Sequence, residues 1–200
     1  MNTELEPQEH IEYHPDAYPE FKHWPKISRL SKETCVITEK IDGTNGIIFI
    51  DPITKAVLAG SRNRWLKPGE SDNYGFRQWV LDHQLELRQL GHGFHYGEWY
   101  GQGIQRGYGL TEKRFALFGK PADAPIPPCC SRVPEMYRGP WDALKVGLCL
   151  ALLREGGSHA VPGFGKPEGI VVQLLDAGKR YKVLLENDDT HKWEQPCLTP

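Results

Sequence analysis

The stretch TEKIDGTNG, residues 38–46, places one lysine at the end of an apolar run and follows it with Asp, Gly, Thr, Asn and Gly. Residues 34–37 before it and residues 46–50 after it are typical of buried strands. A hairpin turn between these strands would explain the Asp-Gly and Asn-Gly pairs, which tolerate positive φ. It would not explain Lys40, because a cation at the sheltered end of a strand is costly to desolvate. Burial disfavours the charged form of a lysine, and the neutral amine is a nucleophile, so the stretch also predicts an activated lysine beside a tight polar turn.

The composition is that of an ordinary globular chain. Its 200 residues are 39% hydrophobic and 25% charged, which suits one domain. The net charge of −2 gives no overall basic field, so any binding of nucleic acid has to come from local patches. The polar start MNTELEPQEH and the lack of a run of about eighteen apolar residues lead us to expect a cytoplasmic protein with no membrane partner. Five cysteines without a CxxC pair favour reduced thiols over disulfides or a zinc cluster.

The remaining predicted elements mix strands and helices without strict βαβ alternation. Residues 1–33 are predicted to be an irregular lead-in that packs on the domain. The pattern then predicts strands over 56–59, 94–100 and 114–118, a helix over 72–90 between a capping Asp72 and Gly91, a loop over 120–134, a helix from Pro140 to about 154 closed by two glycines, and a hairpin of 169–175 and 180–185. This mixture predicts an α+β fold of mostly antiparallel sheets with packed helices.

Several charged residues lie near the ends of predicted strands, and two of them neighbour a glycine. They are Arg62, Glu98 in YGEWYG, Glu168 in EGIVVQ and Lys182 in RYKVLL. Taken singly, Arg62 could be a loop cation, Glu168 a solvated strand end and Lys182 an edge-strand charge, whereas the aromatics around Glu98 are harder to reconcile with a surface position. Together with Lys40 and Asp42, these residues supply a nucleophile, carboxylates and cations. That set suits phosphoryl chemistry, in which carboxylates hold Mg²⁺ and cations neutralise phosphate oxygens.

In this order the motifs resemble those of the covalent nucleotidyltransferase superfamily of ATP-dependent ligases and capping enzymes. The matching stretches are EKIDGTNG, SR at 61–62, YGEWYG, RFALFG at 114–119, EGIVVQ and RYKVLL, which extend from Glu39 to Lys182. Gly-Thr-Asn after the lysine, and WYGQGIQRGYG after the third motif, resemble the RNA ligase 2-type RNA ligases. DNA ligases typically have an arginine where Asn45 stands.

The resemblance implies that Lys40 attacks the α-phosphorus of ATP and becomes a lysine–AMP. The AMP would pass to a 5′-phosphate end, which a 3′-OH end then attacks. The implied catalytic residues are Lys40, Lys182 and Glu168. The implied ATP-binding residues are Glu39, Lys40, Asn45, Arg62, Glu98, Phe118, Glu168, Arg180 and Lys182, with Phe118 stacking on adenine. A Mg²⁺ or Mn²⁺ ion would be held by Asp42, Glu98 and Glu168.

The chain departs from the family pattern at three places. Arg180 stands where the fifth motif usually begins with lysine, and Gly119 replaces an acid that commonly follows the stacking aromatic. Eighteen residues follow Lys182. We therefore expect a single nucleotidyltransferase domain over 1–200, without a C-terminal OB or helical domain, which seals alone or with a helper protein.

Other functions fit the same residues. The active-site motifs do not distinguish an RNA ligase from a DNA nick ligase, and a non-ligating module that binds adenylate or nucleic acid could keep the pocket. A guanylyltransferase is disfavoured by the Gly-Thr-Asn turn and the short C-terminus. Two local basic clusters are placed to follow a phosphate backbone: Arg62, Arg64, Lys67, and Arg106, Lys113, Arg114.

Overall fold

Two β-sheets and three α-helices make up the part of the chain that the computed structural model describes, residues 20–121 and 123–186. The strands are β1 (Thr34–Lys40), β2 (Thr44–Ile50), β3 (Val57–Gly60), β4 (Gly93–Gly101), β5 (Lys113–Leu117), β6 (Cys130–Arg132), β7 (Glu135–Pro140), β8 (Gly169–Leu174) and β9 (Lys179–Leu184). The helices are α1 (Phe76–Asp82), α2 (Gln84–Leu87) and α3 (Ala143–Gly156), with 3-10 turns at Leu30–Lys32, Arg88–Leu90 and Gly107–Gly109.

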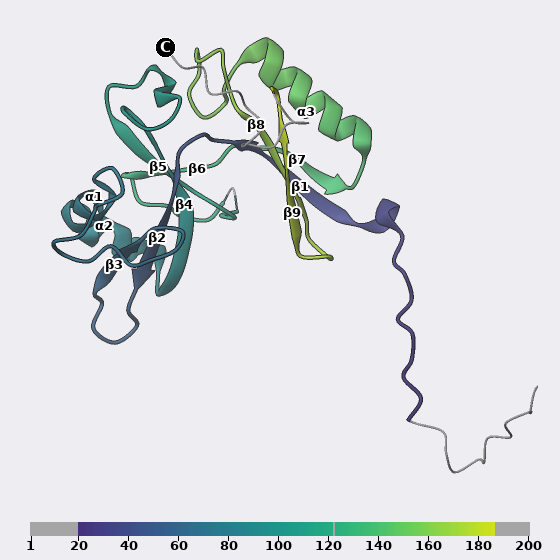
Figure 1. The fold of residues 1–200 in the computed structure, drawn as a ribbon, viewed down its shortest axis with the longest axis horizontal. Coiled ribbons are helices and arrows are strands. Elements are labelled where there is room, and N and C mark those ends of the chain that lie inside the picture. Colours follow the sequence, from purple (N-terminus) through teal and green to yellow (C-terminus); the bar gives the residue numbers. More distant parts are fainter. Residues whose placement is uncertain (1–19, 122, 187–200) are drawn as a thin grey trace, which may run out of the picture.

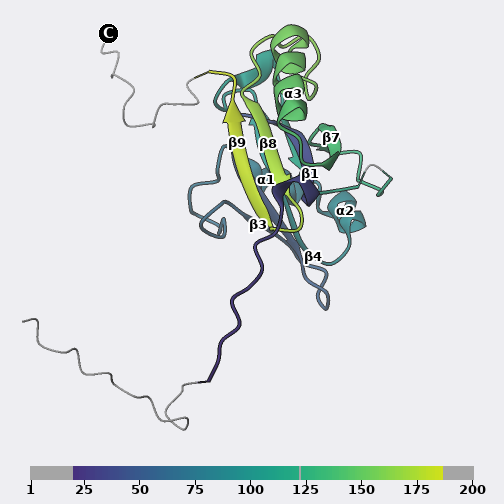
Figure 2. The ribbon, with the colours of Figure 1, turned by 90° about the vertical axis from the view of Figure 1, so that its right-hand side faces the viewer.

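The strands form a four-stranded sheet of order β7-β1-β8-β9 and a five-stranded sheet of order β3-β2-β4-β5-β6 (Figure 1). All neighbours are antiparallel except β5 and β6, which run parallel. Figure 2 shows α3 lying against the four-stranded sheet. The predicted α+β fold of mostly antiparallel sheets is confirmed. No helix of the described residues is both long and apolar enough to cross a membrane.

The hairpin that would have explained the Asp-Gly and Asn-Gly pairs does not form, because β1 and β2 belong to different sheets. Residues 41–43 instead carry the chain from one sheet into the other. The glycines of this stretch serve close packing rather than positive φ. A Cβ on Gly43 would overlap the carbonyl oxygen of Trp99, and one on Gly46 would lie 2.6 Å from Cζ of Phe76. The sequence pattern located both strands but not their partners.

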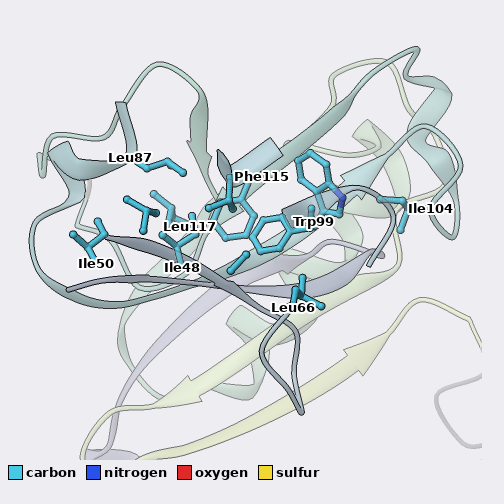
Figure 3. Close-up of a cluster of buried hydrophobic side chains, with 12 residues drawn as sticks. Ile48, Ile50, Leu66, Leu87, Trp99, Ile104, Phe115 and Leu117 are labelled. Atoms are coloured by element: carbon cyan, nitrogen blue, oxygen red, sulfur yellow. The ribbon is translucent and has the colours of Figure 1, made fainter. Parts of the chain in front are cut away.

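Three apolar clusters hold the layers together. The first fills the face of the five-stranded sheet that α1 covers, and Figure 3 shows Ile48, Trp99 and Phe115 among its members. The second lies between α3 and the four-stranded sheet, where Leu153 packs with Ile37. The third joins the two halves of the fold and consists of Ile41, Tyr100, Tyr108, Ala116, Val133 and Val161.

The helices differ in detail from the sequence prediction. The predicted helix over 72–90 is divided into α1, α2 and a 3-10 turn, with a break at His83. The N-cap residue is Gly75 rather than the predicted Asp72, although the Asp72 carboxylate still accepts hydrogen bonds from the Arg77 and Gln78 backbone N–H groups of the first turn. The later helix begins at Ala143 with Asp142 as its N-cap, rather than at Pro140, which ends β7. Its predicted end at the two glycines is confirmed.

Two further segments differ from expectation. The predicted loop over 120–134 contains β6, and residues 135–140 form β7 on the edge of the four-stranded sheet. The predicted lead-in does not pack on the domain over residues 20–32, which are exposed and extend away from both sheets (Figures 1 and 2). Residues 1–19 lie outside the described part. The hairpin of β8 and β9 matches its prediction.

We predict that Gly97→Ala destabilises the fold by about 1–3 kcal/mol, because a Cβ there would overlap the Ala116 carbonyl oxygen and the Phe115 ring. Urea unfolding measures the change. Gly147→Ala in α3 is the matched control, because its Cβ would meet no atom within 4 Å. The control should be unchanged or up to about 1 kcal/mol more stable. Equal effects of the two substitutions would contradict the packing account.

Candidate active site

Lys40 and Glu168 form an ion pair where β1 and β8 meet. Lys40 is the last residue of β1 and lies opposite Gly169, the first residue of β8. Its Nζ atom is 2.5 Å from Oε2 of Glu168, and the two side chains are 24% and 16% exposed. A Cβ on Gly169 would overlap the Val183 carbonyl oxygen, so glycine is needed for β9 to approach this closely. The Lys40–Glu168 pair is therefore half-buried and remains accessible to solvent.

Glu98 on β4 is the second carboxylate of the site. Its Oε1 accepts a hydrogen bond from the Gly43 backbone N–H and its Oε2 accepts one from the Asn45 side-chain amide, each at 3.1 Å. Burial raises the pKa of Glu98 to about 7, and the charge of Lys40 and the Gly43 hydrogen bond offset part of that rise. Glu98 is thus a carboxyl group that can be protonated or ionised near neutral pH.

Arg62 extends the network from Glu98 toward solvent. Asn45 lies opposite Glu98 in the five-stranded sheet. Its Oδ1 atom accepts a hydrogen bond of 2.8 Å from Nε of Arg62, which follows β3. The amide of Asn45 therefore connects a cation to the buried carboxylate, and the structure brings these three predicted site residues together.

Lys182 and Arg180 lie on the same sheet face as Lys40. Residues opposite one another in neighbouring strands share a face. Lys182 lies opposite Val171 and Arg180 opposite Gln173 across β8, in the same alternation as the Lys40–Gly169 pair. The register therefore presents a row of cations on one face, with Lys182 nearer to Lys40 than Arg180.

Phe118 follows β5, and its backbone N–H donates to the Tyr96 carbonyl oxygen at 2.8 Å. This pairing continues the β4–β5 register, so Phe118 shares the sheet face of Glu98. Its side chain is 40% exposed, which leaves a ring available to a planar ligand. This exposure argues against a role for Phe118 in packing the core.

Glu39 has a different position from its neighbour in the sequence. Its carboxylate is buried and accepts hydrogen bonds from the Ser158 hydroxyl and from the backbone N–H groups of His159 and Ala160, at 2.6–2.8 Å. Alternation along β1 places this side chain on the face opposite that of Lys40. The structure gives the Glu39 carboxylate a structural role, and only its backbone remains close to the site.

Asp42 pairs with Arg106, a residue that the sequence analysis assigned only to a basic cluster. Nε of Arg106 is 3.0 Å from Oδ2 of Asp42, and its NH1 group donates to the Lys166 carbonyl at 3.0 Å. The Asp42 backbone N–H donates to the Tyr108 hydroxyl at 2.8 Å. Arg106 thus ties the segment after Lys40 to the segment before Glu168. The glycine-rich run GQGIQRGYG was the sequence signal that could have indicated a specifically folded loop around Arg106. The structure bears this out, because its glycines at 101, 103, 107 and 109 adopt positive φ.

The three carboxylates predicted to hold a metal do not form one cluster. Among the described residues, no group of three or more His, Cys, Asp or Glu side chains is arranged to hold a metal ion. Asp42 is engaged by Arg106, Glu168 by Lys40 and Glu98 by neutral donors. The metal ligands stay a prediction, and an ion here would need further ligands from a bound nucleotide.

The fold and the site together define a nucleotidyltransferase-type domain, with a lysine at a strand end, acids beside it and cations on one sheet face. Comparison with known families agrees, because the model of the RNA ligase family matches residues 33–184. The chain therefore belongs to the RNA ligase family. The resemblance read from the motifs is confirmed at this level.

Solved structures of the same fold come from Naegleria gruberi RNA ligase. A mutant with ATP and Mn is 18% identical, covers 78% of this chain and 50% of its own, and has a TM-score of 0.56. A mutant with AMP and Mn is 17% identical, covers 84% and 57%, and has a TM-score of 0.53. This chain thus spans little more than half the length of those proteins. The comparison with curated proteins found no match.

We predict that the raised pKa of Glu98 makes the fold less stable as the pH rises. Between the ordinary glutamate value of 4.5 and about 7, the folded chain binds a proton at Glu98 that the unfolded chain has released. The free energy of unfolding therefore falls across this window, by about 3 kcal/mol for this group. In Glu98→Gln that contribution disappears, which urea unfolding at several pH values measures. Glu155→Gln, at an exposed position of α3, should keep the wild-type pH dependence.

Proposed function

We propose that this chain carries the nucleotidyltransferase activity of an ATP-dependent RNA ligase, with Lys40 as the acceptor of AMP. The observation that carries the proposal is the Lys40–Glu168 pair, with Glu98 close enough for its pKa to respond to both charges. Membership of the RNA ligase family supports it. The fold relatives with ATP and Mn, or AMP and Mn, support nucleotide and divalent metal as ligands of this fold.

In the first step, the lone pair of Lys40 Nζ attacks the α-phosphorus of ATP. A P–N bond forms, the P–O bond to the β-phosphate breaks, and pyrophosphate leaves with the electron pair. Attack requires the amine to lose a proton, and Glu168 Oε2, at 2.5 Å, is within reach to accept it. An RNA 5′-phosphate oxygen then attacks the phosphorus of the phosphoramidate, the P–N bond breaks and Lys40 regains its amine. A 3′-OH finally attacks the RNA 5′-phosphate, and AMP leaves with the electron pair of the broken P–O bond.

The surrounding residues have distinct roles in binding the nucleotide. The exposed ring of Phe118 can stack on adenine, and Glu98 can accept from or donate to a ribose hydroxyl because it titrates near neutral pH. Arg62, Arg180 and Lys182 supply cations for the phosphates. A Mg²⁺ or Mn²⁺ ion would neutralise charge on the phosphate oxygens, with Glu168 and Glu98 as its candidate carboxylate ligands.

The deciding experiment is intact mass after incubation with ATP and Mg²⁺. The wild-type chain should gain one AMP, and Lys40→Ala should gain none, because the substitution removes the amine that is paired with Glu168. Protein as purified is first treated with pyrophosphate, which removes AMP already attached. Lys179→Ala, at an exposed position of β9, is the matched lysine control and should label normally. Labelling that survives Lys40→Ala, or a wild type that never labels, would contradict the proposal.

The alternative functions give different outcomes. A DNA nick ligase would form the same lysine–AMP but would seal a nick in DNA and not RNA ends. A non-ligating module would bind ATP in the wild type and in Lys40→Ala, without covalent AMP in either. A helper protein is implied only if the labelled chain transfers AMP to RNA ends slowly by itself.

We also predict that Arg106→Ala slows AMP attachment about ten- to a hundredfold, because Arg106 fixes the segments on either side of the Lys40–Glu168 pair. Single-turnover labelling measures this rate, and circular dichroism establishes that the variant is folded. Arg154→Ala, at an exposed position of α3, is the matched arginine control. A folded Arg106→Ala variant that labels at the wild-type rate would refute the role.

A further inference from the structure

The sheet face that carries Glu98 continues into a group of solvent-facing aromatic side chains. Residues 94, 96 and 98 of β4 project to the same face, because side chains alternate along a strand. Phe94 and Tyr96 are 53% and 51% exposed. Phe49 lies opposite Phe94 on β2, and Trp65 packs beside both of these rings. We call Phe49, Trp65, Phe94 and Tyr96 the aromatic platform.

The rings of the platform are arranged to receive planar groups. The centroids of Phe94 and Tyr96 are 6.1 Å apart with an interplanar angle of 13°, and those of Trp65 and Phe94 are 6.2 Å apart with an angle of 29°. Phe49 supports Phe94 at 4.7 Å. A solvated face of an antiparallel sheet ordinarily carries polar residues, so a group of exposed aromatics indicates a binding surface.

The charge around the platform favours a polyanion. Residues 52–69, which contain the edge strand β3 and its flanking loops, include four basic residues and no acidic one. The four are Lys55, Arg62, Arg64 and Lys67. Trp65 and Leu58 also line a groove of about 380 Å³ between β3 and α1, whose lining includes Lys67, Arg77 and the apolar Val80 and Leu81. Aromatic rings beside such a basic edge match the pattern by which proteins bind single strands of nucleic acid.

We propose that the aromatic platform binds a single-stranded stretch of the RNA substrate, with bases stacked on Phe94, Tyr96 and Trp65 and phosphates along residues 52–69. The strand so bound leads to Glu98 and Asn45 on the same sheet face, and from there to Lys40. Exposed aromatics on a sheet stack two or three bases in known RNA-binding modules. The assignment rests on the proposed function, since it places the substrate of that same site.

The test is equilibrium binding of a fluorescein-labelled, single-stranded RNA oligonucleotide to the full chain without ATP, followed by fluorescence anisotropy. Phe94→Ala and Trp65→Ala should each weaken binding roughly five- to a hundredfold, the range for loss of one stacked base. Phe94→Tyr keeps a π face and should bind like the wild type, whereas Phe94→Leu keeps only apolar bulk and should bind weakly. Leu148→Ala removes an exposed apolar residue from α3 and is the matched control.

Several outcomes would overturn the assignment. Unchanged RNA affinity in the Phe94 and Trp65 variants would remove it, as would a Phe94→Leu variant that binds like Phe94→Tyr. A wild type whose mass in solution is dimeric and becomes monomeric in Phe94→Ala would assign the platform to a second copy of the chain.

Failure of the platform can be distinguished from failure of the proposed function. A chain that labels with AMP on Lys40 but binds RNA independently of Phe94 refutes the platform alone. A chain that never labels but binds RNA through Phe94 refutes the proposed function and keeps the platform.

Discussion

The structure of the site depends on how the chain passes from one sheet into the other directly after Lys40. Residues 41–43 make this passage, and each of them is fixed by a different contact. Ile41 packs in the apolar cluster between the sheets. Asp42 contacts Tyr108 through its backbone N–H and Arg106 through its carboxylate. Gly43 lies where a Cβ would overlap its neighbours. Lys40 is therefore the end of a paired strand with an immobilised continuation. An amine held in this way loses little orientational freedom when it meets an electrophile.

The neighbouring residue shows how one strand end can serve stability and chemistry at once. Glu39 carries a buried carboxylate, which is tolerated because three donors of the turn after α3 satisfy it. That turn is thereby tied to the end of β1. Since successive side chains of a strand point to opposite faces, the same bonds leave Lys40 on the open face beside Glu168. The dipeptide Glu39-Lys40 thus divides structure and reactivity between two faces.

Much of the fold and site could be predicted from the sequence, for identifiable reasons. The strands around Lys40 and the final hairpin could be predicted, because the spacing of apolar residues along the sequence follows the burial of side chains in a strand. The motif order gave the family. Strand partners could not be predicted from the sequence, and the hairpin considered for residues 34–50 does not form. It also missed the role of Arg106, whose partners are Asp42 and a carbonyl of a segment distant in the chain. Such contacts arise only when the sheets meet.

A gradient of burial along β4 separates the chemistry from the polymer that the chemistry would act on. Tyr100 is 1% exposed, Glu98 is 8% exposed and Tyr96 is 51% exposed, all on one face of one strand. Near the buried end, charges interact strongly because little water screens them, which suits the stabilisation of a phosphoryl transition state. Near the exposed end, the rings of Phe94 and Tyr96 face solvent, so a base could stack on them without entering a buried cavity. A strand with this gradient can hold a nucleotide beside the buried Glu98 while the rest of the substrate stays in solvent beside Tyr96.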